Sequence, residues 1–398
     1  MSELRNSARL STRVTLVLLG MSALLNMYST QPILADVAQW AGTELRGATW
    51  TVSATTVGVV LTAPWAGMIS DRWGRRRIIL AALCCMALLS LGGLVAWNLA
   101  SLLAIRAAQG MCCPFIFAVV VAYVGEEYAP PLAARLNSLY VAGTALGGFL
   151  GRMVAALIVE TSGQWRLSFL GNALMIAGTW AVARACLPLE RRFEARFHSA
   201  ERGRGGAGII FHNPRLLATV LLGATLLFQQ VGSFTFASLT LARPPFSLPT
   251  GAVGLIFVIF LLPMLTTPLS GRLMQSRGEL RVFALAQAVS VVGLAISLIP
   301  TVPAMVSGLA FSCVGVFAGQ AAGTSMAGKL APQARSAAVG LYLSGYYLGG
   351  ALGASAPVGL YLAHGWEAVA ILLMAVVSCG LVLGVGAWRG VKVVFSRH

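Results

Sequence analysis

The sequence predicts an all-α membrane protein whose 12 transmembrane helices form two six-helix bundles related by pseudo-two-fold symmetry. Apolar residues make up 58% of the 398 residues and charged residues only 10%, which excludes a soluble globular protein. The chain also repeats itself at an offset of 202 residues. The residues Leu139, Tyr140, Gly143, Gly147, Gly148 and Gly151 return as Leu341, Tyr342, Gly345, Gly349, Gly350 and Gly353. Because both copies lie in long apolar runs, the repeat unit is predicted to be a bundle of membrane helices.

A membrane-spanning helix needs about 20 apolar residues. Reading the apolar runs between polar breaks gives twelve such segments in order along the chain. Their centres lie near Leu19, Val59, Leu88, Cys113, Gly147, Ile176, Leu227, Phe260, Val289, Ser312, Gly349 and Val376. Residues 1–187 are therefore expected to form the N-terminal bundle and residues 214–398 the C-terminal bundle. The long polar segment 188–213 is predicted to be a cytoplasmic linker between them.

The distribution of positive charge predicts the orientation, because Lys and Arg concentrate in short cytoplasmic loops. With the N-terminus inside, 23 of the 28 Lys and Arg residues lie on the cytoplasmic side and three lie outside. The remaining two, Arg106 and Arg152, lie within predicted spans. Both termini are therefore expected to be cytoplasmic. The same bias accounts for the net charge of +16, so no nucleic-acid partner is implied.

A glycine- and arginine-rich motif occupies the loop after the second span, from Gly67 to Arg77. Its glycines allow close helix approach and a sharp turn. The acid at position 71 can accept hydrogen bonds from a helix N-terminus, and the arginines can donate to helix C-terminal carbonyls. We expect a conformational switch built from Gly67, Asp71, Arg72, Gly74, Arg75 and Arg76. A degenerate copy of the motif follows 204 residues later, with Gln275 in place of the acid. Its other matching residues are Gly271, Gly278 and Arg281.

This motif resembles the signature between spans 2 and 3 of the major facilitator superfamily. The segment Arg106-Ala107-Ala108-Gln109-Gly110 resembles the superfamily's span 4 motif, and the glycines of span 5 resemble its antiporter motif without the usual proline. More narrowly, the chain looks like the YnfM-like group of bacterial inner-membrane efflux permeases. That likeness rests on Tyr28-Ser29-Thr30-Gln31-Pro32, on Gly147-Gly148 with Gly151-Arg152, and on the run from Leu341 to Gly349.

The two arginines within spans lie at one level. Each is eight residues from the outer end of its span, or about 12 Å at 1.5 Å per residue. An arginine at that depth costs at least ~2.5 kcal/mol, so each is expected to face a wet cavity or a partner. The alternatives are that Arg106 bonds backbone carbonyls and polar groups of span 1, and that the glycine-rich face of span 5 with Arg152 packs against the other half.

Acids are scarce within the spans, and none of the four histidines lies in one. Proton-coupled carriers commonly titrate a buried carboxylate. The proton-coupling candidates are Asp36, at the outer end of span 1, and Glu126, with its neighbour Glu127, at the inner end of span 4. The alternatives are a solvated helix-end acid for Asp36 and contacts with loop arginines for the two glutamates.

The family resemblance places spans 1, 4, 7 and 10 around a central pathway. The candidate substrate-binding residues in and beside these spans are Tyr28, Gln31, Arg106, Gln109, Phe228, Gln229, Gln230, Gln320 and Tyr346. Aromatic walls with a few polar groups suit amphipathic organic molecules. For any single Tyr or Gln, a hydrogen bond between helices is an equally good interpretation. Helix packing and buried charge are assigned to Gly143, Gly147, Gly148, Gly151 and Arg152.

Parallel duplication with a site between the halves is typical of secondary transporters. The sequence and the resemblance predict a monomeric, multi-pass carrier of the bacterial inner membrane that moves small organic solutes by alternating access, with proton-coupled efflux as the leading mode. The alternative is an organic-anion carrier or exchanger that uses Arg106 and Arg152. A membrane-embedded enzyme would need clustered acids and histidines within its spans, and the predicted spans of this chain have no such cluster. All seven cysteines lie in apolar segments, and no P-loop is present, so neither a metal nor a cofactor is expected.

Overall fold

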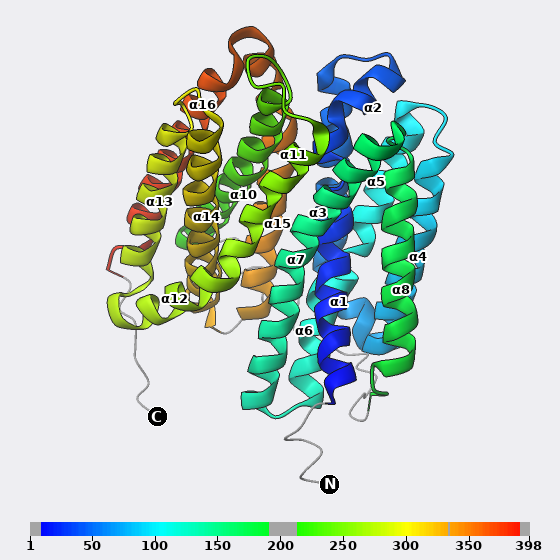
Figure 1. The fold of residues 1–398 in the computed structure, drawn as a ribbon. Coiled ribbons are helices and arrows are strands. Elements are labelled where there is room, and N and C mark those ends of the chain that lie inside the picture. The colour runs from blue at the N-terminus through cyan, green and yellow to red at the C-terminus, as the bar shows by residue number, and fades with distance from the viewer. Residues whose placement is uncertain (1–8, 191–212, 333–334, 391–398) are drawn as a thin grey trace.

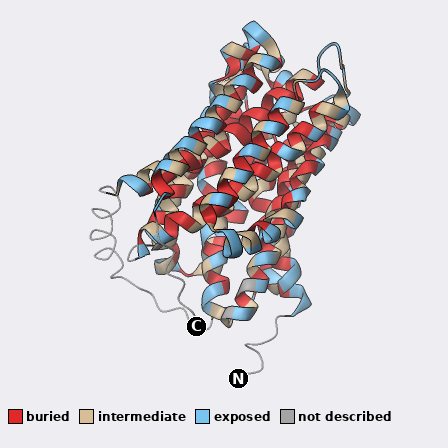
Figure 2. Cartoon of the chain, turned by 90° about the vertical axis from the view of Figure 1, so that its left-hand side faces the viewer, coloured by how far each residue is buried: buried red, intermediate tan, exposed pale blue. Residues whose placement is uncertain are grey.

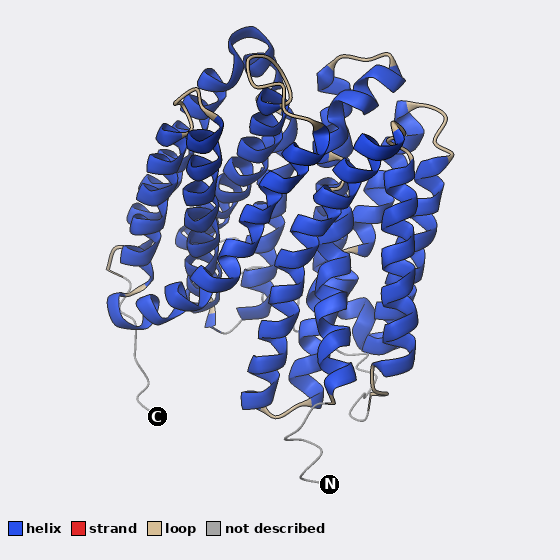
Figure 3. Cartoon of the chain, in the orientation of Figure 1, coloured by secondary structure: helices blue, strands red, loops and turns tan. Residues whose placement is uncertain are grey.

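The computed structural model describes residues 9–190, 213–332 and 335–390. Within these ranges the regular elements are all helices, as Figure 3 shows. The helices form two bundles that lie side by side in Figure 1, one from each half of the chain. The predicted linker 188–213 lies mostly outside the described residues. The all-α membrane fold expected from the sequence is confirmed.

The N-terminal bundle contains six membrane crossings. Its helices are α1 (Leu10–Met27), η2 (Gln31–Ile33), α2 (Leu34–Ala41), α3 (Leu45–Trp73), α4 (Arg75–Leu94), α5 (Leu99–Cys112), α6 (Pro114–Glu127), α7 (Pro130–Ser162) and α8 (Leu167–Cys186). The first crossing is broken into α1, a 3₁₀ turn and α2, because Pro32 lacks the N–H that an α-helix needs. The fourth is divided into α5 and α6 just before Pro114.

The C-terminal bundle repeats this plan. Its helices are α10 (Pro214–Leu241), α11 (Thr250–Ile256), η3 (Phe257–Leu261), α12 (Leu262–Arg277), α13 (Glu279–Ile296), α14 (Val302–Leu330), α15 (Arg335–Ser355) and α16 (Val358–Trp388). The 3₁₀ segment η3 divides α11 from α12 and ends two residues before Pro263, which lies in the first turn of α12. Eleven crossings in the described residues are long and apolar enough to span a membrane, and the 21-residue helix α15 supplies the twelfth.

Burial separates central from peripheral crossings. In four crossings, 50–61% of the most apolar 18-residue stretch is buried, against 33–44% in the other seven. The four crossings are Leu10–Ala41, Leu99–Glu127, Pro214–Leu241 and Val302–Leu330. These four are spans 1, 4, 7 and 10, which the family resemblance places around the pathway. Figure 2 shows buried residues along the length of the helices, with exposed residues on the surface around them.

The repeated glycines bring two helices into close contact within each half. A methyl group on Gly143, Gly147 or Gly151 of α7 would overlap the backbone of α1 at Val17, Met21 or Leu25. The equivalent glycines of α15, Gly345, Gly349 and Gly353, meet α10 at Val220, Ala224 and Phe228. The expectation that this face of span 5 packs against the other half is therefore wrong for Gly143, Gly147 and Gly151, whereas Gly148 and Arg152 do lie toward Phe260 of the other half. The repeat is a property of each half, so the repeated glycine face forms a contact inside each half.

The hydrogen bonds between the two halves lie toward one end of the molecule. We call "lower" the end in Figure 1 that carries the α3–α4 turn and both ends of the described chain, and "upper" the end that carries α2 and α11. In the described residues, the hydrogen bonds between the halves are donated by Gln31 to α10, by Ser53 to the carbonyl of Ala351 at 2.7 Å, and by the Gly251 N–H to Glu160. All of them lie in the upper part, so the two halves are hydrogen-bonded to each other there.

Candidate functional site

Arg152 of α7 lies between the two halves and is only 2% exposed. Its Nε donates to Oε1 of Gln31 at 2.7 Å, and its Nη1 donates to the carbonyl of Gly148 on its own helix. The guanidinium carbon lies 4.4–4.8 Å from the ring centroids of Tyr28, Phe257 and Phe260. No ion pair in the described part of the chain involves Arg152. The cation is held by neutral acceptors and aromatic faces alone.

Gln31 carries this contact into the other half. It is 1% exposed at the start of η2, and its Nε2 donates to Oγ1 of Thr235 at 2.6 Å and to the carbonyl of Val231 at 3.2 Å. Because its Oε1 accepts from Arg152, the amide group uses both its ends. Arg152, Gln31 and α10 therefore form a continuous hydrogen-bonded link from the N-terminal to the C-terminal half.

Aromatic side chains from both halves surround this link. Phe257 and Phe260 belong to η3, and Phe260 contacts Phe317 of α14 edge-on, with ring centroids 6.3 Å apart. Phe117 of α6 stacks on Tyr347 of α15 across the two halves, at 5.8 Å and an interplanar angle of 4°. The hydroxyl of Tyr28 is buried, and no described group forms a hydrogen bond with it. The surroundings of Arg152 are apolar and aromatic, with unused hydrogen-bonding capacity.

Arg106 of α5 occupies a different environment, inside the N-terminal half. It is fully buried, and its guanidinium donates to the carbonyls of Asn26, Met27 and Thr51 at 2.7–3.2 Å. It also donates to Oε1 of Gln109 at 2.7 Å, whose own Nε2 donates to Ser90. All three guanidinium nitrogens have partners, so in this conformation Arg106 caps the C-terminal carbonyls of α1 and holds them against α3 and α5.

Two of the remaining candidate residues form hydrogen bonds between helices, and the others are half-buried or buried. Gln229 donates to Oγ of Ser312 at 2.6 Å and Gln230 donates to Sγ of Cys313 at 3.4 Å, so both join α10 to α14. Phe228, Gln320 and Tyr346 complete the candidate set. Phe228 and Gln320 are half-buried, and Tyr346 is buried with its ring centroid 6.3 Å from that of Tyr342. Of the nine candidates, Tyr28 and Gln31 contact Arg152 directly.

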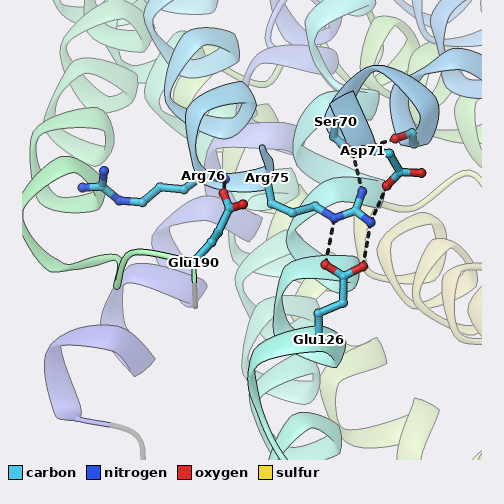
Figure 4. Close-up of polar contacts among 7 residues, drawn as sticks. Ser70, Asp71, Arg75, Arg76, Glu126 and Glu190 are labelled. Carbon is cyan, nitrogen blue, oxygen red and sulfur yellow. Dashed lines mark hydrogen bonds and ion pairs between the residues drawn. The ribbon is translucent and has the colours of Figure 1, made fainter. Parts of the chain in front are cut away.

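The predicted switch motif forms a polar cluster at the lower end, which Figure 4 shows. Arg75 pairs with Asp71 at 2.6 Å and with Glu126 at 2.7 Å, and so ties α3 and α4 to the end of α6. Arg76 donates to the carbonyls of Arg184 and Leu187 at the end of α8. Arg76 thus bonds helix-end carbonyls as the sequence predicts, whereas the partner of Asp71 is an arginine of its own motif.

Gly74 makes the turn of this motif possible. It separates α3 from α4 with φ +94°, a conformation that costs other residues strain, and Gly278 repeats it between α12 and α13 with φ +81°. Gly67 and Gly271 each lie seven residues before the glycine of the turn, and nothing lies within 4 Å of the place where a Cβ would be. Arg72 lies in the last turn of α3. The glycines at the turns are thus required by backbone geometry in both halves.

Neither proton-coupling candidate lies beside Arg152. Glu126 pairs with Arg75 at the lower surface, where its side chain is 48% exposed. Asp36 is half-buried in the first turn of α2, where a helix N-terminus stabilises a carboxylate. The placement of Glu126 matches the alternative of a contact with a loop arginine, whereas Asp36 is half-buried and not fully solvated; both acids stay predictions as coupling groups.

Sequence reasoning missed Phe257, Phe260 and Thr235. Nothing in an apolar run distinguishes a phenylalanine that faces lipid from one that faces the other half. Two prolines could have pointed to the site, because Pro32 and Pro263 interrupt spans 1 and 8 where η2 and η3 flank Arg152. Interrupted helices near the midplane are a general sign of binding sites in transporters.

Comparison with known proteins agrees with this architecture. The model of the Major Facilitator Superfamily matches residues 16–262. The uncharacterized MFS-type transporter YybF of Bacillus subtilis is 25% identical over 334 residues, 83% of this chain and 81% of the relative. The inner membrane transport protein YnfM of Escherichia coli is 25% identical over 391 residues, 94% of this chain and 89% of YnfM. The crystal structure of the nucleoside transporter NupG superposes with a TM-score of 0.76 at 12% identity, over 95% of this chain and all of NupG.

Proposed function

Because this chain belongs to the major facilitator superfamily and is a multi-pass membrane transporter rather than an enzyme, we propose that it carries small organic anions between its two halves by alternating access. The single observation that supports this proposal most strongly is Arg152. It is a buried cation between the halves, with no anionic partner in the described part of the chain. A substrate carboxylate would supply that partner.

The chemistry around Arg152 favours an aromatic or otherwise amphipathic anion. Burying a cation without an anion is costly, and a bound carboxylate would recover part of that cost through charge-assisted hydrogen bonds. Tyr28, Phe257 and Phe260 offer ring faces and edges beside the guanidinium. A planar apolar body and a carboxylate would therefore both find complementary groups.

The conformation is consistent with one state of an alternating-access cycle. Cross-half hydrogen bonds lie in the upper part, where Thr51 and Ser53 of α3 are buried, and none is found at the lower end of the described residues. Taking the lower end as cytoplasmic, as the positive charges favour, this is the inward-facing state of an inner-membrane carrier. Substrate would then enter from the cytoplasm and meet Arg152 beneath the hydrogen-bonded upper end.

Proton-coupled efflux is the second candidate mode, and Asp36 is the observation that favours it. Asp36 is a half-buried acid in α2, three residues beyond the end of the 3₁₀ turn Gln31–Ile33. A proton entering from the upper side would reach this carboxylate before it reached Arg152. Exchange of anions, by contrast, would need no titrating acid.

Counterflow in proteoliposomes tests the proposal. Radiolabelled hydrocinnamate, an aromatic carboxylate, should accumulate transiently in vesicles preloaded with the unlabelled compound, without any pH gradient. The neutral hydrocinnamamide should give little counterflow. An imposed pH gradient should change the direction or the extent of accumulation only if transport is coupled to protons. Equal counterflow of the acid and the amide, or none of either, would contradict an anion carrier.

A further inference from the structure

We propose that Arg152 and Gln31 form a latch through which binding of a carboxylate opens the upper end. The inference rests on the proposed function, because it assigns to the same anion site a second task. Arg152 would be the group that senses the substrate, and Gln31 would be a positioning residue that transmits the binding event to the contact between the halves. Both roles are inferred from the hydrogen bonds of the Gln31 side-chain amide.

The two ends of the Gln31 side-chain amide have different hydrogen-bond partners. Its Oε1 accepts from Nε of Arg152 at 2.7 Å, and this leaves its Nε2 directed at Oγ1 of Thr235 at 2.6 Å and the carbonyl of Val231 at 3.2 Å. An amide has one acceptor end and one donor end, so a cation at one end fixes the donor toward the other half. Arg152 thus orients Gln31 for its contact with α10.

A carboxylate would compete with Gln31 for Arg152. Charge-assisted hydrogen bonds to a guanidinium are about twice as strong as neutral ones, and a carboxylate can accept two of them in parallel. Nη2 of Arg152 has no acceptor among the described residues, so it offers a first contact without displacing anything. Rotation of the guanidinium to a bidentate geometry would then withdraw Nε from Oε1 of Gln31.

Release of Gln31 would loosen the contact between the halves at two places. The amide would lose the group that orients it toward Thr235 and Val231. The guanidinium would also change its position against Phe257 and Phe260, ring faces that belong to the C-terminal half. The other described cross-half hydrogen bonds, from Ser53 to Ala351 and from Gly251 to Glu160, share no residue with Arg152. They hold the upper end without sensing the site.

The experiment measures opening of the upper end by pulsed electron resonance between two spin labels. One label replaces Gln39 in α2 and the other replaces Ala242 after α10; both residues are exposed at the upper end on opposite halves. The exposed cysteines Cys84, Cys85 and Cys379 are replaced by serine beforehand. Distance distributions are recorded with and without saturating hydrocinnamate, and binding is measured by titration on the same samples.

Gln31→Met is the test variant, because methionine keeps the length of the side chain, offers Arg152 only a weak thioether acceptor, and cannot donate to Thr235. Ser53→Ala is the matched control, which removes a cross-half hydrogen bond unconnected to Arg152. Thr235→Val is a second test variant with the substitution on the opposite side of the latch. Folding of each variant is checked by its elution as a single species.

In the wild type and in Ser53→Ala, hydrocinnamate should raise the population with the longer distance about fivefold or more, the lower range of allosteric coupling. In Gln31→Met this population should already be raised without ligand and should change less than twofold on binding. Thr235→Val should fall between these two. A ligand-induced change in Gln31→Met equal to that of the wild type overturns the latch. Absence of binding to the wild type instead overturns the proposed function.

Discussion

At the scale of residues, two buried arginines lie at similar depths but differ in what surrounds them. Arg106 donates from all three nitrogens to carbonyl groups of its own half. Arg152 makes two hydrogen bonds and is otherwise enclosed by aromatic rings. The first arrangement resembles a helix cap and the second resembles a binding site that lacks its anion. Stability and binding should therefore respond differently to substitution at the two positions.

Arg106→Lys should destabilise the folded protein by about 2–4 kcal/mol, because one ammonium group cannot reach the carbonyls of Asn26, Met27 and Thr51 together and leaves buried acceptors unpaired. Arg152→Lys should change stability by less than about 1 kcal/mol, since it keeps the charge and breaks fewer hydrogen bonds. Thermal unfolding in detergent measures both. Equal losses of stability in the two variants would remove the distinction between cap and site.

Asp36→Asn tests coupling to protons. The substitution keeps the shape of the side chain and its place in the first turn of α2 but removes the titrating group. If Asp36 carries the proton, accumulation driven by a pH gradient should be lost while counterflow without a gradient persists. Gradient-driven accumulation in proteoliposomes measures the first, and counterflow provides the control. Unchanged accumulation in the variant would leave exchange of anions, or coupling through Glu126, as the mechanism.

At the scale of elements, two features arrange the site: close pairs of helices inside each half and broken helices between the halves. Glycines every four residues let α7 lie against α1 and α15 against α10. The rigid α1–α7 pair fixes Arg152 relative to Gln31. The 3₁₀ segments η2 and η3 then present Gln31, Phe257 and Phe260 to it.

Gly147→Ala and its repeat partner Gly349→Ala should each destabilise the protein by about 1–3 kcal/mol, because the added methyl meets the carbonyl of Met21 or of Ala224. Gly178→Ala in α8 is the matched control, since nothing lies within 4 Å of the position of its Cβ. That control should be neutral or slightly stabilising. The thermal unfolding midpoints of the variants measure these effects. A Gly147→Ala protein as stable as Gly178→Ala would contradict the close packing of α7 against α1.

The sequence was sufficient for the fold because length, apolarity and repetition are properties of whole segments. Twelve apolar runs and a repeat offset of 202 residues predict twelve crossings in two bundles, and the structure has them. The partner of a repeated face is a different matter. Glycines spaced at Gly143, Gly147 and Gly151 show which face of a helix is in close contact, but the same spacing serves a partner in either half, and the partner expected here was wrong.

The candidate site could be predicted only in part. Tyr28, Gln31 and Arg152 stood out because polar or charged groups are rare in apolar spans, and the structure places them together. Phe257 and Phe260 did not stand out, because an apolar residue in an apolar run has no distinguishing chemistry. Their position is decided by the packing of η3 against α7, which is a contact between residues far apart in the sequence.

At the scale of the whole molecule, both halves also have an ion pair at the lower end, with opposite polarity. Arg75 at the start of α4 pairs with Glu126 at the end of α6, and Glu279 at the start of α13 pairs with Lys329 near the end of α14. The two pairs occupy equivalent places at offsets of 204 and 203 residues. The two pairs share no residue, so each connects helices of one half only.

Reversing one charge, as in Lys329→Glu, should destabilise the C-terminal half, because two carboxylates would then face each other and Glu279 is 6% exposed. The double variant Glu279→Lys with Lys329→Glu should recover at least half of the loss. A double-mutant cycle on thermal unfolding measures the coupling between the two residues. No recovery in the double variant would show that the pair does not stabilise this end.

The central claim is that Arg152 binds the anionic group of the substrate. Isothermal titration of the purified protein with hydrocinnamate and with hydrocinnamamide tests it most directly, comparing the wild type with Arg152→Gln. The wild type should bind the carboxylate at least about tenfold more tightly than the amide, a difference of 1.4 kcal/mol. Arg152→Gln should lose that preference while it remains folded. A wild type without preference, or an Arg152→Gln variant that keeps it, would contradict the account.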